Sequence, residues 1–153
     1  MDNFSIEELL SRQGKSLRKV RHGELRIRSG WTYNKTAGIT PAGSENRFYS
    51  NAFSIHNARI VCWELVAEHE PAPVNRDLNF EFRLHGKDDA TIANAVADSW
   101  IPAGSDLTEQ TACWGSAYPG SWEIGNYRYS IHYRPDSTNK QPALEHSISF
   151  TVY

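Results

Sequence analysis

The hexapeptide Trp122-Glu123-Ile124-Gly125-Asn126-Tyr127 gives the strongest indication of how this chain folds. After it, apolar and polar residues alternate up to Tyr133, and a second alternating run covers residues 148–152 after a polar turn. Alternation with a period of two is typical of a strand that buries one face. The stretch therefore predicts a corner that leads into two paired strands, which close a β-sandwich.

Similar patterns occur upstream of this corner. They predict further strands over residues 24–33, with a bulge before Gly30, and over 58–68, 78–84, 91–100 and 105–114. Residues 58–68 are apolar on both faces, which indicates a central strand that is covered on both sides. Residues 91–100 also fit helical spacing, but the turn before them favours a hairpin partner. Leu107 is out of phase with Ala112 and Trp114, so we expect a bulge in the last of these strands.

The N-terminal segment has a different pattern. Ser5 is an N-cap candidate, Glu8 completes a capping box, and Gly14 supplies a stop, so a short helix is predicted over residues 5–13. Residues 34–46 are expected to form a loop. We therefore predict a single domain over residues 1–153: an all-β, antiparallel sandwich of about seven to nine strands over 17–153, preceded by one short α-helix.

The segment Ile124-Gly125-Asn126-Tyr127-x-Tyr129-x-Ile131 resembles the tyrosine corner of immunoglobulin-like and fibronectin-like β-sandwiches. In such domains the hydroxyl group of the corner Tyr bonds back to the backbone. The resemblance implies that Tyr127 is the corner residue and that residues 127–133 and 146–153 are the last two strands. Antibody-type domains carry a Cys where this chain has Tyr129, so the resemblance implies no intersheet disulfide and no antibody-like role.

Charge and composition narrow the range of partners. The chain has 16 basic and 18 acidic residues, for a net charge of −2, which argues against nucleic acid as a partner. No apolar run approaches the roughly 20 residues of a membrane-spanning helix, so no membrane partner is expected. The N-terminus shows no secretory signal, so we expect a cytoplasmic location. In that reducing compartment Cys62 and Cys113 are expected to remain thiols, and a disulfide between them would require export.

The sequence indicates no catalytic residues, no metal ligands and no cofactor. It contains no GxSxG nucleophile motif, no phosphate-binding glycine loop and no zinc-ligand spacing. The densest ionisable cluster is Glu68-His69-Glu70, at a predicted strand end. An enzyme with a site across strands, around Glu68, His69 and His85, is one alternative to a non-enzymatic protein.

Three aromatic residues, Trp114, Tyr118 and Trp122, occur in or beside a loop rich in Gly, Ser and Pro. They are the candidate ligand-binding residues, because exposed aromatic faces stack on sugars and peptides. Core packing is the competing interpretation for two of them, with Trp122 at the corner and Trp114 at the end of the sandwich. Tyr118, beside Pro119-Gly120, is the best candidate for an exposed ring.

These observations favour a non-enzymatic interaction module that recognises a protein partner or assembles with copies of itself. The high aromatic content, the docking helix predicted over residues 5–13 and the lack of a catalytic set support this hypothesis. A carbohydrate-binding module with a glycan on the aromatic loop is the first alternative, and an enzyme is the second. A sandwich fold alone does not choose among them, since one fold hosts many functions.

Overall fold

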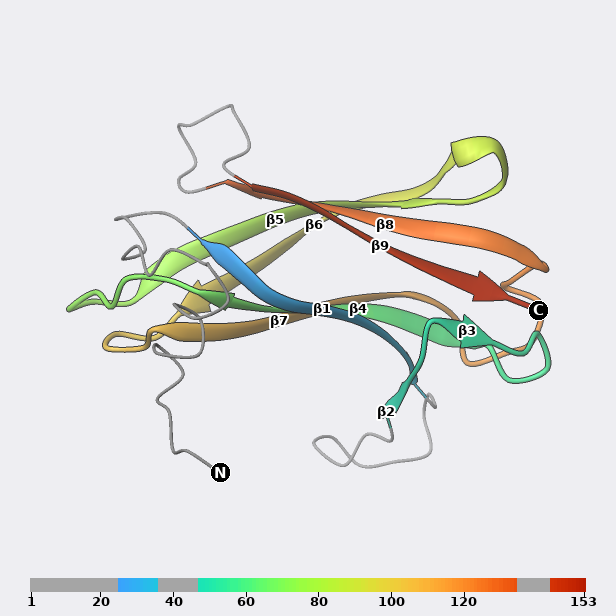
Figure 1. The fold of residues 1–153 in the computed structure, drawn as a ribbon, viewed down its shortest axis with the longest axis horizontal. Coiled ribbons are helices and arrows are strands. Elements are labelled where there is room, and N and C mark those ends of the chain that lie inside the picture. The colour runs from blue at the N-terminus through green and yellow to red at the C-terminus, as the bar shows by residue number, and fades with distance from the viewer. Residues whose placement is uncertain (1–24, 36–46, 135–143) are drawn as a thin grey trace, which may run out of the picture.

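The computed structural model describes residues 25–35, 47–134 and 144–153 (Figure 1). The helix predicted over residues 5–13 and most of the loop predicted over 34–46 lie outside this part of the chain. Within it, the regular elements are nine strands and one short 3-10 turn at Lys87–Asp89. The all-β prediction is confirmed, with the strand count at the upper end of the expected range.

The strands form two sheets that lie over one another as two layers (Figure 1). Sheet A has the order β2-β1-β4-β7, with strands β1 (Arg26–Lys35), β2 (Arg47–Tyr49), β4 (Ile60–Glu68) and β7 (Leu107–Gly115). Sheet B has the order β3-β9-β8-β5-β6, with strands β3 (Ala52–Phe53), β5 (Arg76–His85), β6 (Thr91–Ile101), β8 (Gly125–Arg134) and β9 (Leu144–Val152). Neighbouring strands are antiparallel, except that β3 runs parallel to β9.

The centre of the core lies between β4 and β5, whose inward side chains are buried: Val61, Trp63, Leu65, Ala67, Leu78, Phe80, Phe82 and Leu84. The Trp63 ring packs edge-on against Phe80 and Phe82, with ring centroids 5.7 and 5.6 Å apart. In sheet A, β4 lies between β1 and β7, and its outward side chains are buried at Cys62 and Glu64 and partly buried at Ile60, Val66 and Glu68. The prediction of a central strand covered on both sides is therefore confirmed.

Three finer predictions can be compared with the strand registers. The bulge in the first strand is confirmed, since the β1–β4 register shifts between Ile27 and Ser29. The strand prediction for residues 91–100 is also confirmed by β6. The bulge expected at Leu107 is wrong, because the β4–β7 register is unbroken. No bulge is needed, because Leu107 points outward, away from the core, and its side chain is 43% exposed.

The corner before β8 has the geometry that the resemblance implies. The Tyr127 hydroxyl group donates to the carbonyl oxygen of Glu123 at 2.8 Å and accepts from the Glu123 backbone N–H at 3.1 Å. The Tyr127 ring lies 4.9 Å from the Trp122 ring and stacks 5.3 Å from Phe150. The corner residue therefore links the local turn to the core, and β8 and β9 are the last two strands, as predicted.

Tyr129 joins the two sheets through its side chain. Its ring is fully buried, and its hydroxyl group donates to the carbonyl oxygen of Val61 on β4 at 2.6 Å. Burial raises the pKa of Tyr129 far above its ordinary value of 10. The unfolded chain therefore loses this proton at a lower pH than the folded chain does. Stability from this group is complete below pH 10 and is lost as the pH rises above it.

We expect Tyr129→Phe to reduce the loss of stability at alkaline pH. At neutral pH the variant should lose about 1–2 kcal/mol, because the Val61 carbonyl group lacks its partner. Urea unfolding at a series of pH values from 7 to about 11 measures both effects. The wild-type protein should lose more stability than Tyr129→Phe above pH 10, and equal losses would contradict this account of the buried hydroxyl group.

Candidate functional site

The three candidate aromatic residues do not share one exposed surface. Trp122 is only 3% exposed, and its indole N–H donates to the carbonyl oxygen of Arg59 at 2.8 Å. Trp114 is half-buried and packs edge-on against Trp122, with ring centroids 4.9 Å apart. Tyr118 is 77% exposed. The structure thus brings two of the rings together in the packing of the sandwich and leaves the third in solvent, and ligand binding by this loop stays a prediction.

The residues of the alternative enzyme site lie at opposite ends of β5. His69 is near the beginning of this strand, where its Nδ1 atom lies 3.1 Å from the Arg76 guanidinium group. His85 is the last residue of the same strand, and its Nε2 atom lies 2.9 Å from the Ser130 hydroxyl group. A strand of this length spans about 30 Å. The structure therefore does not bring His85 to Glu68 and His69.

Among residues 25–35, 47–134 and 144–153, no three His, Cys, Asp or Glu side chains are grouped so that they could hold a metal ion. No helix in these ranges has the length and the apolar character that crossing a membrane requires.

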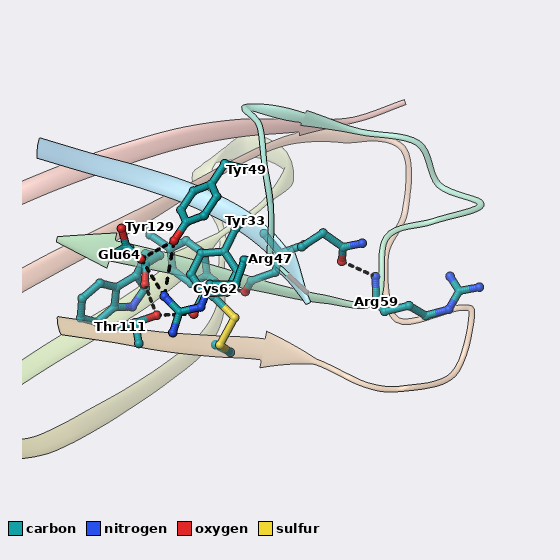
Figure 2. Close-up of a disulfide and its surroundings, with 12 residues drawn as sticks. Tyr33, Arg47, Tyr49, Arg59, Cys62, Glu64, Thr111 and Tyr129 are labelled. Carbon is teal, nitrogen blue, oxygen red and sulfur yellow. Dashed lines mark hydrogen bonds and ion pairs between the residues drawn. A yellow bond between two sulfur atoms is a disulfide. The ribbon is translucent and has the colours of Figure 1, made fainter. Parts of the chain in front are cut away.

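Cys62 and Cys113 form a disulfide, which corrects the expectation that both remain thiols (Figure 2). The two residues are direct partners in the β4–β7 register, with Cα atoms 3.9 Å apart. Cys62 is buried, whereas Cys113 is exposed on edge strand β7. The bond lies within sheet A, so it is not the intersheet disulfide of antibody-type domains.

A polar cluster covers the outer face of sheet A beside this disulfide (Figure 2). The Oε2 atom of the buried Glu64 accepts from the Tyr49 hydroxyl group at 2.6 Å and from Arg47 at 2.8 Å. The Arg47 guanidinium group lies 4.7 Å from the centroid of the Tyr33 ring, and the Tyr33 hydroxyl group lies 2.7 Å from that of Thr111. The hydrogen bond with Tyr49 raises the pKa of Arg47, and burial raises the pKa of Tyr49.

This cluster has a structural role that sequence reasoning missed. A buried carboxylate is costly unless charged or polar groups compensate it, and Arg47 and Tyr49 both do so for Glu64. Because Arg47 and Tyr49 belong to β2, the same contacts hold that three-residue strand over the rest of sheet A. Each partner is separated from Glu64 by at least 15 positions, so no local motif marks the cluster.

The candidate interaction surface is the outer edge of β6. In the order of sheet B, β6 is a terminal strand, and no strand in the described ranges pairs with its other side. It has eleven residues with a single charge, Asp98, and its outward Val96 and Trp100 are 64% and 55% exposed. Soluble proteins usually protect such edges with Lys, Pro or bulges. The pairing of β6 with β5 has one register shift, opposite Leu84 and His85. The rest of β6 contains no Lys, no Pro and no further bulge.

Comparison with known proteins gives matches among solved structures. The chain is similar to the C-terminal domain of wzt, with a TM-score of 0.51 and 12% identity over 88% of this chain and 75% of that chain. It is also similar to an immunoglobulin-like protein (PA1606) from Pseudomonas aeruginosa, with a TM-score of 0.43 and 12% identity over 85% and 97% of the two chains. No protein-family model and no curated protein matches the chain.

The fold is an immunoglobulin-like β-sandwich. Two stacked sheets and the tyrosine corner carry this conclusion. A structural likeness at 12% identity shows the fold alone, and one fold hosts many functions.

Proposed function

We propose that this immunoglobulin-like sandwich is a non-enzymatic interaction module that assembles with a second copy of itself. The contact is an antiparallel pairing of the two β6 strands, which joins the two copies of sheet B into one continuous sheet. A strand edge offers a row of backbone N–H and C=O groups, and a second strand satisfies them.

The observation that carries the proposal is the self-complementary sequence of β6. When two copies pair about a two-fold axis at Val96, the two Val96 side chains lie opposite one another. Asn94 then lies opposite Asp98, an amide opposite a carboxylate, and Ile92 lies opposite Trp100. Toward the core, Ala95 lies opposite Ala97, where small side chains offer no steric obstacle. Each polar residue of the outer face thus meets a polar partner and each apolar residue an apolar one.

The charge of β6 also favours this pairing. Asp98 is its only charged residue, and the two-fold arrangement separates the two copies of Asp98. The whole chain has a net charge of only −2, so repulsion between two copies is weak. A single strand pair makes a small interface, and we expect a dissociation constant on the order of micromolar.

Val96→Lys is expected to abolish the dimer. The substitution places two ammonium groups opposite each other at the axis, while the exposed position and the neighbouring Glu81 on β5 accommodate lysine in the monomer. Light scattering after size exclusion, over a range of micromolar concentrations, should give twice the chain mass of 17.4 kDa for the wild type. The variant should give the mass of one chain.

Val74→Lys is the matched control. Val74 is 65% exposed, as Val96 is, but it lies in the connection before β5 and not in an edge strand. This variant should remain dimeric. A wild-type chain that is monomeric at all concentrations would overturn the proposal, and so would a dimer that survives Val96→Lys.

Carbohydrate binding by the aromatic loop and the cytoplasmic location remain predictions from the sequence. One observation supports carbohydrate binding by this loop, namely the exposed ring of Tyr118. For the location, disulfides are typical of oxidising compartments, so the Cys62–Cys113 bond favours a location outside the cytoplasm.

A further inference from the structure

A groove of about 1100 Å³ opens at one end of sheet B. Its walls come from three separate segments: the turn between β5 and β6, the corner leading into β8, and the end of β9. Its lining includes six polar or charged side chains of interest: Lys87, Asp88, Asp89, Glu123, Asn126 and Arg128. None of these six belongs to β6, which contributes only Ile92, near its beginning, to the lining.

Arg128 and Asp89 form the fixed centre of this polar lining. One terminal nitrogen of Arg128 donates to both carboxylate oxygens of Asp89, at 2.9 and 3.1 Å, and the other donates to the Ser147 hydroxyl group at 3.2 Å. The hydrogen bond with Arg128 lowers the pKa of Asp89. A guanidinium group has five N–H donors, and these contacts leave several of them for a ligand.

Among the described residues, further side chains around this pair keep donors or acceptors that no protein group uses. In the described part of the chain, the side chains of Lys87, Asp88 and Glu123 make no hydrogen bond or ion pair. The Asn126 side-chain oxygen accepts from Thr151 at 2.9 Å, which leaves the amide N–H groups of Asn126 for another acceptor. The groove therefore presents hydrogen-bond donors and acceptors side by side. They belong to the turn between β5 and β6, to the corner before β8 and to β8 itself.

The charges of the groove limit the class of ligand. Two cationic and three anionic side chains line it, so a phosphate or another anion meets net repulsion. The carboxylates do not form a three-ligand group for a metal ion in the described residues. A sugar hydroxyl group both donates and accepts, and it therefore matches a carboxylate and a guanidinium group placed next to each other.

We propose that this groove binds a neutral saccharide. Its hydroxyl groups hydrogen-bond to Arg128, Asp88 and the Asn126 amide, and the 70% exposed Ile124 contacts the apolar face of a sugar ring. The groove volume accommodates more than one sugar unit, so an oligosaccharide is the expected ligand. This site differs from the aromatic loop at Tyr118.

The test is calorimetric titration with neutral trisaccharides of glucose, galactose and mannose, and with inorganic phosphate as the charged probe. At least one trisaccharide should bind, and phosphate should not. Arg128→Ala should weaken binding at least tenfold. Asp88→Asn should also weaken it, and because the Asp88 side chain makes no hydrogen bond or ion pair in the described residues, a loss of folding does not explain that result.

Arg83→Ala is the control on the same face of sheet B, since Arg83 pairs with Glu81 at 3.6 Å and does not line the groove. It should bind the trisaccharide as the wild type does. The proposal fails if no trisaccharide binds, if phosphate binds more tightly, or if both groove variants bind normally. Val96 does not line the groove, so the dimer test with Val96→Lys reports on the β6 edge alone and the trisaccharide titration reports on the groove.

Discussion

Replacing both cysteines, by Cys62→Ala and Cys113→Ala together, is expected to lower the free energy of unfolding by about 4 kcal/mol. The disulfide closes a loop of 51 positions. In the chain-entropy description, closing a loop of this length lowers the entropy of the unfolded chain by an amount equivalent to about 4 kcal/mol. It also ties edge strand β7 to central strand β4. Urea unfolding of the oxidised wild type and the double variant measures the difference.

A reducing agent provides the control for this prediction. It should destabilise the wild-type protein by a similar amount, because Cys113 is exposed and open to attack, and it should leave the double variant unchanged. A double variant that unfolds at the same urea concentration as the oxidised wild type would show that the bond contributes nothing to stability.

Gly115→Ala is expected to destabilise the sandwich by about 4 kcal/mol. The φ angle of Gly115 is +129°, which other residues rarely adopt, and an added Cβ would lie 2.0 Å from the backbone carbonyl oxygen of Arg59. Overpacking costs about 1–3 kcal/mol and a strained backbone about 1–3 kcal/mol more. The contact is with the backbone of the residue just before β4, so a side-chain rotation does not relieve it.

Gly104→Ala is the matched control. Gly104 also has a positive φ, +78°, but an added Cβ there meets no atom within 4 Å. This variant should lose only about 1 kcal/mol, the cost of the backbone conformation. Thermal or urea unfolding of the two variants should therefore show a large difference, and equal losses would rule out the close approach of Gly115 to Arg59.

The architecture was predictable because its signals are local. The alternation along β5 and β8 follows from the pleat of one strand, and the corner motif spans only the segment from Glu123 to Tyr127. In contrast, β2 and β3 are three and two residues long and carry no pattern of their own. They are strands because of their distant partners in β1 and β9.

The sites were harder to predict because they depend on register and on neighbouring segments. The disulfide requires Cys62 to lie opposite Cys113, and only the β4–β7 register determines that. Trp122 and Tyr118 occur in the same short stretch of sequence, yet one is buried and the other exposed. The pairing of Arg128 with Asp89 joins a strand to a turn 39 positions away, so the chain offers no local sign of it.

The parallel pairing of β3 with β9 also bears on the speed of folding. Ala52 meets Thr151, about 100 positions away, and β5 pairs with β8 across about half that separation. Such distant contacts form only after large loops have closed, and chains rich in them fold in milliseconds to seconds, whereas helical bundles fold in microseconds to milliseconds. A newly made chain of this kind therefore spends a comparatively long time with its strand edges open before the second sheet is complete.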